Sequence, residues 1–346
     1  MSDREPNRES VRRPSRRGRR WLTWVTYAVA AVAFGYVLWH LRLSDLRQGV
    51  SQIIWWPMIL AVLLQIVPRF VQAWRWGYLL RPIKVRLDLL LHAIYVSTLM
   101  NGILPLCPSD LVRGVMVARR TRTGTVRVFS SQAVERAADG VALALVAWLA
   151  VRGLRVPVGV DQGLLALMAL VAVGILVGVF LTLQHRRLHS YVSLREPEGR
   201  VGKGIKAASL EVLAGAKSVN GWTLPVSIST GLSMVAMQVV TMWLMLYAYH
   251  IDVSLFQAAA VFGIVTLGTL LPNAPASIGA WQFFCIMGLE LFGVSATHAA
   301  GFSLVAFVLW TVPSLLIGVV ALIVSPISWA ELRGRRLPEA TGVQPA

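Results

Sequence analysis

The stretches LPLCPSD at residues 104–110 and LPNAPAS at residues 271–277 each place two prolines between apolar runs. Each stretch follows a run long enough for a membrane helix. Because proline lacks a backbone N–H and clashes with the preceding turn, both predict a break in helical backbone at or near membrane depth. Such breaks are tolerated where protein or a polar cavity supplies hydrogen-bond partners, which favours a transporter-type binding site. The alternative is a pair of proline kinks that only shape a helical bundle.

The two stretches also align with each other. An offset of 167 residues places Pro105 on Pro272 and Pro108 on Pro275, with leucine before the first proline in both copies. This correspondence predicts a duplicated fold, with an inverted repeat as one arrangement, in which both breaks meet near the midplane. The four prolines are therefore candidate gating residues.

Composition indicates the class of protein. Hydrophobic residues make up 56% of the chain, mean hydropathy is +0.64, and charged residues make up 14%, against about 25% in a soluble domain. Apolar runs recur along nearly the whole length and leave no stretch for a soluble catalytic domain of ordinary size. We therefore expect an all-α polytopic membrane protein with about eight spanning helices plus two short broken or re-entrant helices.

Patterns that would indicate catalysis are missing. Cys107 and Cys285 lie in apolar context, and the six histidines show no metal-ligand spacing. There is no Gly-rich phosphate loop, nucleophile elbow or zinc-protease motif. We expect no catalytic residue, no metal, no cofactor and no enzymatic activity. The net charge of +17 lies in tails and loops, where anionic lipid headgroups explain it more simply than nucleic acid does.

The chain divides into five expected parts. The first is a basic, disordered cytoplasmic tail, and the apolar run after it is too long for the core of a signal peptide. Two membrane halves follow, separated by a basic cytoplasmic connector, and a second cytoplasmic tail ends the chain. The parts cover residues 1–20, 21–184, 185–221, 222–326 and 327–346. Full spans are expected near 21–41, 53–76, 87–104, 129–151, 164–183, 222–249, 256–271 and 300–324, with short segments at 111–118 and 278–292.

The number of crossings depends on the two short segments. The basic loops at 77–86, 119–127 and 185–221 can all be cytoplasmic only if both short segments carry the chain across the membrane. If each segment is instead a re-entrant hairpin, one basic loop faces outward.

Ionisable residues are concentrated beside the first break. Asp110 and Arg113 are three residues apart, and Glu135 and Asp139 are four apart with Arg136 between them, so each pair shares a helix face. A charged side chain at the bilayer centre costs at least about 2.5–3.5 kcal/mol, so these groups must pair or line a hydrated cavity. We predict that they face a substrate, with an interhelical salt-bridge network as the alternative.

Several of these residues form motifs of a known family. The run Asn101-Gly-Ile-Leu-Pro105, followed by Asp110 with Arg113 and by Glu135-Arg-Ala-Ala-Asp at 135–139, resembles the lysylphosphatidylglycerol synthase transmembrane region family, a flippase-like domain. That family shows Asn-x-x-x-Pro, an acidic residue with Arg, and Glu-Arg-x-x-Asp.

A second motif supports the resemblance. Residues 272–282 look like the family's Pro-x-x-Pro-Gly-Gly-x-Gly-x-x-Glu, and the pair Arg75-Trp76 also fits, so the resemblance extends from about residue 21 to 324. It adds Arg75 and Gln282 to the substrate-binding candidates and Gly279 to the gating candidates. Asn101, just before the first break, is a further substrate-binding candidate, with capping of freed backbone groups as the alternative. Arg75 has a simpler alternative as an interfacial anchor whose charge reaches the headgroups.

The chain departs from the family pattern at four positions. Ser109 stands where the family usually has Gly, Ala276 and Ser277 replace the Gly pair, and Gln282 replaces the Glu. Loss of the glycines predicts a less sharply bent or less closely approached backbone at the second break. Loss of the carboxylate argues against a proton- or cation-dependent role there.

The resemblance implies lipid handling. Its members are associated with moving aminoacylated or glycan-linked lipids across bacterial membranes, so we expect a lipid translocator in the bacterial cytoplasmic membrane with a cytoplasmic N-terminus. Expected partners are anionic, aminoacylated or polyprenyl-phosphate lipids, and a second copy of the chain or a lipid-biosynthesis protein. The alternatives are an integral-membrane transferase acting on a lipid carrier and an accessory scaffold of a biosynthetic complex.

Overall fold

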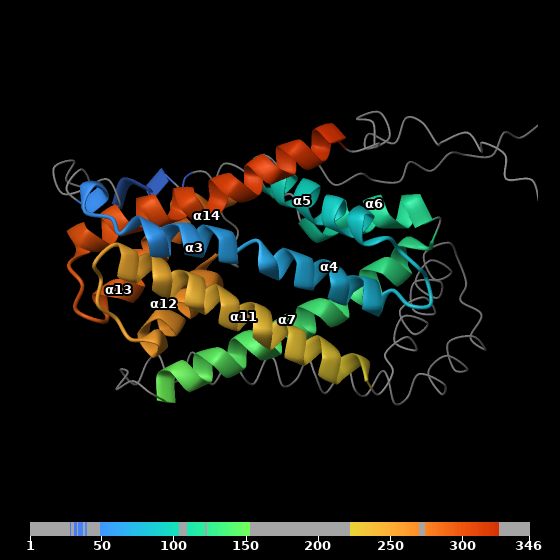
Figure 1. Cartoon of the computed structure of the whole chain (residues 1–346), viewed down its shortest axis with the longest axis horizontal. Coiled ribbons are helices and arrows are strands. Elements are labelled where there is room, and N and C mark those ends of the chain that lie inside the picture. The colour runs from blue at the N-terminus through green and yellow to red at the C-terminus, as the bar shows by residue number, and fades with distance from the viewer. Residues whose placement is uncertain are drawn as a thin grey trace, which may run out of the picture.

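The computed structural model describes residues 49–103, 109–121, 123–152, 222–269 and 274–324, and isolated helical positions between 28 and 39. Within these ranges the chain forms helices and no strands, which confirms the all-α prediction (Figure 1). The first half contains α3 (Trp55–Leu64), α4 (Val67–Leu79), α5 (Leu87–Ile103), α6 (Ser109–Thr121) and α7 (Thr125–Arg152). The second half contains α11 (Thr223–Ala248), α12 (Leu255–Gly268), the 3-10 turn η1 (Pro275–Ser277), α13 (Ala280–Glu290) and α14 (Ala296–Val324).

Three helical stretches in the described ranges are long and apolar enough to cross a membrane. They are Trp55–Leu79, Pro225–Ala248 and Ala296–Val324, and the shorter apolar helices are Leu87–Ile103 and Leu255–Gly268. The chain is therefore a polytopic helical membrane protein. The spans expected at 21–41 and 164–183, the connector and both tails lie partly or wholly outside the described residues.

The span expected at 53–76 is two helices. A turn at Gln65 and Ile66 separates α3 from α4, and Pro68 stands in the first turn of α4. Because Pro68 has no N–H to donate to the carbonyl four residues earlier, the helical ladder cannot continue through it. The Gln65 side chain donates from Nε2 to the Leu309 carbonyl in α14, at 2.9 Å, and so ties the turn to the second half.

The offset that aligns the two breaks also aligns the helices around them. Moving residues 55–79 forward by 167 gives 222–246, which nearly coincides with α11, and the same shift places α5 on α12, α6 on α13 and α7 on α14. The contacts between the two halves follow the same correspondence, so that each contact has a counterpart between the equivalent helices. The helix α5 packs on α14 while α12 packs on α7, and α3 packs on α14 while α11 packs on α7.

The two copies run in opposite directions. The Ile54 N–H, just before α3, donates to the Ala248 carbonyl at the end of α11 at 3.0 Å. Near the other end of the same pair, the Arg75 guanidinium of α4 reaches the Ser227 carbonyl in the first turns of α11 at 3.4 Å. Figure 1 shows α3 and α4 lying alongside α11. Antiparallel copies with exchanged contacts form an inverted repeat, the arrangement found in many transporters.

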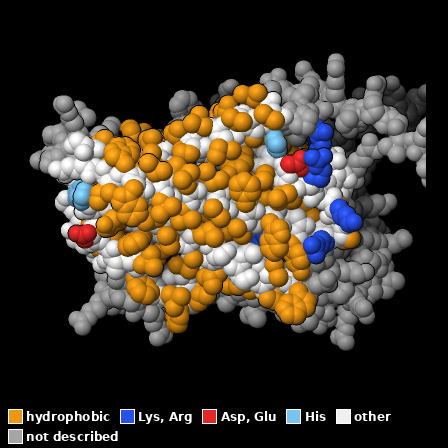
Figure 2. All heavy atoms as spheres, in the orientation of Figure 1, with side chains coloured by type: hydrophobic (Ala, Val, Ile, Leu, Met, Phe, Trp, Pro, Cys, Tyr) orange, Lys and Arg blue, Asp and Glu red, His pale blue; other side chains and the backbone are white. Residues whose placement is uncertain are grey.

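Apolar side chains cover much of the molecule. Figure 2 shows a broad band of them across one face, with Lys and Arg side chains gathered at one end. Exposed residues of α3 and α14 such as Trp55, Trp56 and Ile323 are between 56% and 77% accessible. Exposed apolar area of this extent is unusual in soluble proteins and is explained by contact with lipid.

Candidate functional site

The carboxylate of Glu135 in α7 is the centre of a buried ionic cluster. Its Oε1 accepts hydrogen bonds from Gln72 Nε2 at 2.9 Å, Arg75 Nη2 at 3.2 Å and Arg113 Nη1 at 3.2 Å. Its Oε2 lies 3.0 Å from Arg113 Nη2. One carboxylate therefore joins α4, α6 and α7 at a single point.

Two further carboxylates extend the cluster outward. The Asp110 carboxylate in α6 accepts two parallel hydrogen bonds from the Arg136 guanidinium, at 2.8 and 2.7 Å. It also accepts a hydrogen bond from Arg113 Nε at 3.0 Å. Asp139 lies 2.7 Å from Arg75 Nη1 and 3.8 Å from Arg136 Nη1. The five charged residues predicted beside the first break are thus brought together, and Arg75 joins them.

Burial divides the cluster into two layers. The side chains of Arg75, Arg113 and Glu135 are at most 2% exposed, and we call them the inner layer. The outer layer consists of Asp110, Asp139 and Arg136, which are 33%, 26% and 51% exposed. Only the outer layer can meet a ligand without rearrangement, while the inner layer fixes where the outer side chains stand.

Neighbouring residues hold the inner layer in place. Trp76 is fully buried, lies 4.8 Å from the Arg113 guanidinium with its ring facing that group, and donates Nε1 to Ser131 Oγ at 3.1 Å. Guanidinium groups bind the electron-rich faces of aromatic rings, so Trp76 supports the charge of Arg113. A Cβ atom added at Gly231 of α11 would lie 3.1 Å from Arg75 Nη1, so the missing side chain leaves room for that guanidinium.

The charges do not sum to zero when Arg69 is included. Three arginines face three carboxylates in the two layers, and the half-buried Arg69 lies one turn and a half before Arg75 on α4. Its polar contact within the described chain is with Gln72 Oε1, at 3.4 Å.

Sequence reasoning missed Arg69 and Gln72 as site residues. The signal was their spacing, because residues 69, 72 and 76 recur every three to four positions on one helix face.

The second half carries no counterpart of this cluster. The repeat offset places Arg75 on Met242, Glu135 on Phe302 and Asp139 on Ala306, and these three are at most 1% exposed within an apolar core. Equivalent positions in the same scaffold therefore pack well without charge. Buried ion pairs are often replaceable by apolar residues at no loss of stability, so stability alone does not explain the charges in the first half.

Two predicted site residues lie away from the cluster. Asn101 is exposed in the last turn of α5 and makes no described contact with it. The Gln282 side chain is buried and accepts from the Gly279 N–H at 2.8 Å, which caps the start of α13. Its capping role accounts for its burial, and contact with a substrate stays a prediction for both residues.

At the second break the backbone has a conformation that glycine favours, although Ala276 and Ser277 stand where the family has glycines. Ala276 and Ser277 have φ angles of 54° and 60°, and Gly279 has 85°. Residues with a side chain rarely adopt this region, at a cost of roughly 1–2 kcal/mol each. The backbone therefore keeps the geometry that glycines would favour. Of the gating candidates, Pro275 begins η1, while Pro105, Pro108 and Pro272 lie outside the described residues.

The second break contacts the helix that leads to the first, because η1 packs against α5. Beside it, between α11, α12, α13 and α14, is a cavity of about 200 Å³. Polar and aromatic side chains from all four helices line it, including Gln238, Thr266, Trp281 and Trp310. Within the described chain, no group of three or more His, Cys, Asp or Glu is placed to hold a metal ion.

The chain matches a known protein family. A family model described as the lysylphosphatidylglycerol synthase TM region matches residues 23–318. This match includes both layers of the cluster and the second break. No curated protein matches the chain significantly.

Proposed function

Because the chain belongs to the lysylphosphatidylglycerol synthase transmembrane region family, we propose that it translocates a lipid between the leaflets of a bacterial cytoplasmic membrane. The lipid carries a charged headgroup or a polyprenyl-phosphate linkage. The family and the apolar helices make the chain an integral membrane protein related to lipid metabolism. Movement of the lipid without chemical change is the function that this geometry supports best.

The observation that carries the proposal is the asymmetry of charge between the two halves. An inverted repeat supplies two equivalent positions for each residue, and the chain places ionisable groups at only one of them. Ionisable residues in a membrane segment are costly and mark pathways for charged substrates. A lipid headgroup needs such a path, because its acyl chains can stay in the bilayer while the charge cannot.

The outer layer is suited to exchange partners with a headgroup. Arg136 binds Asp110 through two parallel bonds, and a phosphate offers the same two-point acceptor geometry as a carboxylate. A phosphate can therefore take the place of Asp110 on Arg136 with little change in interaction energy. The released carboxylate of Asp110, together with Asp139, can then hold a cationic group on the same lipid.

The inverted repeat supplies the movement. In transporters of this design the two halves rock against each other around a central site formed at interrupted helices. We assign the gate to the two breaks, at residues 104–110 and 271–277, and the contact of η1 with α5 links the second break to the helix that precedes the first. We further propose that the protein is not an enzyme, because each carboxylate of the cluster is already bonded to guanidinium groups.

The test is lipid movement between leaflets in proteoliposomes that contain fluorescent anionic, aminoacylated or polyprenyl-phosphate lipids. Wild type should move one class, and Arg136→Gln should lower the rate at least about tenfold, since one charge-assisted bond contributes roughly 1.5–3 kcal/mol. The control is Arg127→Gln, the same change on the same helix, outside the cluster. Equal rates for wild type and Arg136→Gln would remove the outer layer from the path, and no movement of any class by wild type would overturn translocation.

A further inference from the structure

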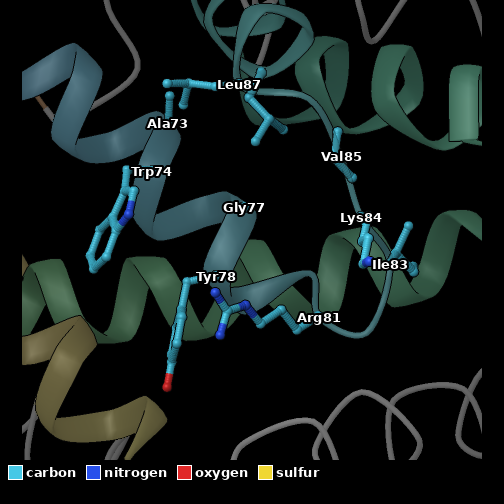
Figure 3. Close-up of a pocket in the computed structure, with 10 residues that line it drawn as sticks. Ala73, Trp74, Gly77, Tyr78, Arg81, Ile83, Lys84, Val85 and Leu87 are labelled. Carbon is cyan, nitrogen blue, oxygen red and sulfur yellow. The ribbon is translucent and has the colours of Figure 1, made fainter.

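A second cavity lies on the opposite side of α4 from the ionic cluster. It has a volume of about 280 Å³ and is bounded by α4, the start of α5 and the loop that joins them (Figure 3). Residues 73, 74, 77 and 78 of α4 line it, whereas residues 72, 75 and 76 face the cluster. The lining residues that matter here are Trp74, Gly77 and Tyr78 of α4, Arg81 and Lys84 of the loop, and Leu87 of α5.

Two cations border this cavity, and none of the described residues that line it is a carboxylate. Arg81 and Lys84 are exposed in the loop, and the Arg81 guanidinium lies 4.7 Å from the centre of the Tyr78 ring. The nearby carboxylate of Asp88 is already held by Arg86, through bonds of 2.7 and 3.1 Å. The cavity therefore carries a net positive charge, and a cavity of this kind attracts anions.

Its other walls are apolar and extend to the lipid-facing surface. Trp74 is 53% exposed and stacks on Tyr78, with ring centres 6.2 Å apart, and Leu87 is 45% exposed. Figure 3 shows Trp74 and Tyr78 projecting from the same side of α4, with the Arg81 guanidinium beside Tyr78. Tryptophan and tyrosine next to basic residues are typical of the level at which lipid headgroups meet the acyl chains.

We propose that this cavity is a binding site for the headgroup of an anionic membrane phospholipid. The phosphate lies between Arg81 and Lys84, and the acyl chains pass outward over Trp74 and Leu87. Basic pockets between membrane helices are the usual environment for such headgroups. The volume is at the small end of ligand sites, which suits a headgroup whose chains stay outside. This binding is separate from translocation and does not depend on it.

The test is native mass spectrometry of the full chain purified in detergent with dioleoylphosphatidylglycerol or dioleoylphosphatidylcholine. Wild type should retain one phosphatidylglycerol under conditions that remove phosphatidylcholine. The double variant Arg81→Gln/Lys84→Gln should bind phosphatidylglycerol at least about tenfold more weakly, because each cation near the membrane surface contributes to binding of an anionic lipid. The control is Arg127→Gln, which removes a cation of α7 that does not line this cavity and should bind as wild type does.

A second variant tests the cavity itself and leaves both cations in place. Gly77 lines the cavity, and Gly77→Leu fills it, so phosphatidylglycerol retention should fall although the charge is unchanged. Equal retention by wild type and the double variant would overturn the site, and so would an equal loss of retention in Arg127→Gln. Displacement of the lipid by an equal concentration of soluble glycerol 3-phosphate would show a site for free phosphate and overturn the assignment to a lipid.

Discussion

Replacing Glu135 by Gln should destabilise the protein strongly. The change keeps the shape of the side chain but removes the charge that faces Arg75 and Arg113, and all three side chains are at most 2% exposed. Removing one partner of a buried ion pair costs about 3–5 kcal/mol, because the remaining charge has neither water nor a counterion. Asp139 and Asp110 still contact the two arginines, so the expected loss is at the lower end, about 3 kcal/mol.

The free energy of unfolding can be measured in mixed micelles by far-UV circular dichroism as denaturing detergent is added. A double-mutant cycle sharpens the result, because Arg75→Met introduces the residue that the second half carries at the equivalent position. The double variant Arg75→Met/Glu135→Gln should lose less stability than the two single losses together, by roughly 0.5–3 kcal/mol. Two results together would refute the view that the inner-layer charges are desolvated and neutralise one another. They are a loss of unfolding free energy below about 1 kcal/mol for Glu135→Gln, and a loss in the double variant equal to the sum of the two single losses.

Three other predictions follow from single positions. Ala276→Gly relieves the strain of the positive φ and should leave stability equal or higher, whereas the control Ala236→Gly in the middle of α11 should cost about 1 kcal/mol in the same unfolding assay. Gly231→Val should lower stability by about 1–3 kcal/mol, because its side chain meets the guanidinium of Arg75. Arg136→Lys should keep the charge but lose the two-point bond, so lipid movement should be slower than in wild type and faster than in Arg136→Gln.

Local sequence patterns predicted the cluster's own residues well. The spacing of Asp110 with Arg113, and of Glu135 with Asp139, indicated shared helix faces, and both pairs meet in one site. The turn between α3 and α4 could also have been predicted, since Pro68 cannot donate the hydrogen bond that a continuous helix requires.

The residues that sequence reasoning missed act across helix contacts. Gln72 reaches Glu135 from another helix, and Gly231 matters only because α11 passes close to Arg75. The spacing of residues along α4 could indicate the helix face of Gln72, but the packing of α4 on α7 sets its distance to Glu135, and the packing of α11 sets the distance of Gly231 to Arg75. The positive φ at Ala276 was also not predictable from local propensity, which favours glycine there, because packing of η1 against α5 and the Gln282 cap hold the chain in the strained form.

Comparison of the two copies of the repeat explains why ionisable side chains identify the candidate site, whereas burial and packing do not. In the second half Phe302 occupies the position of Glu135 and is equally buried, so the fold accepts an aromatic core where the first half has a carboxylate. A chain under selection for stability alone could use the apolar solution twice. Retaining three arginines and three carboxylates in one copy is what the proposed passage of a charged headgroup requires, because such a headgroup needs paired or hydrated ionisable groups along its path.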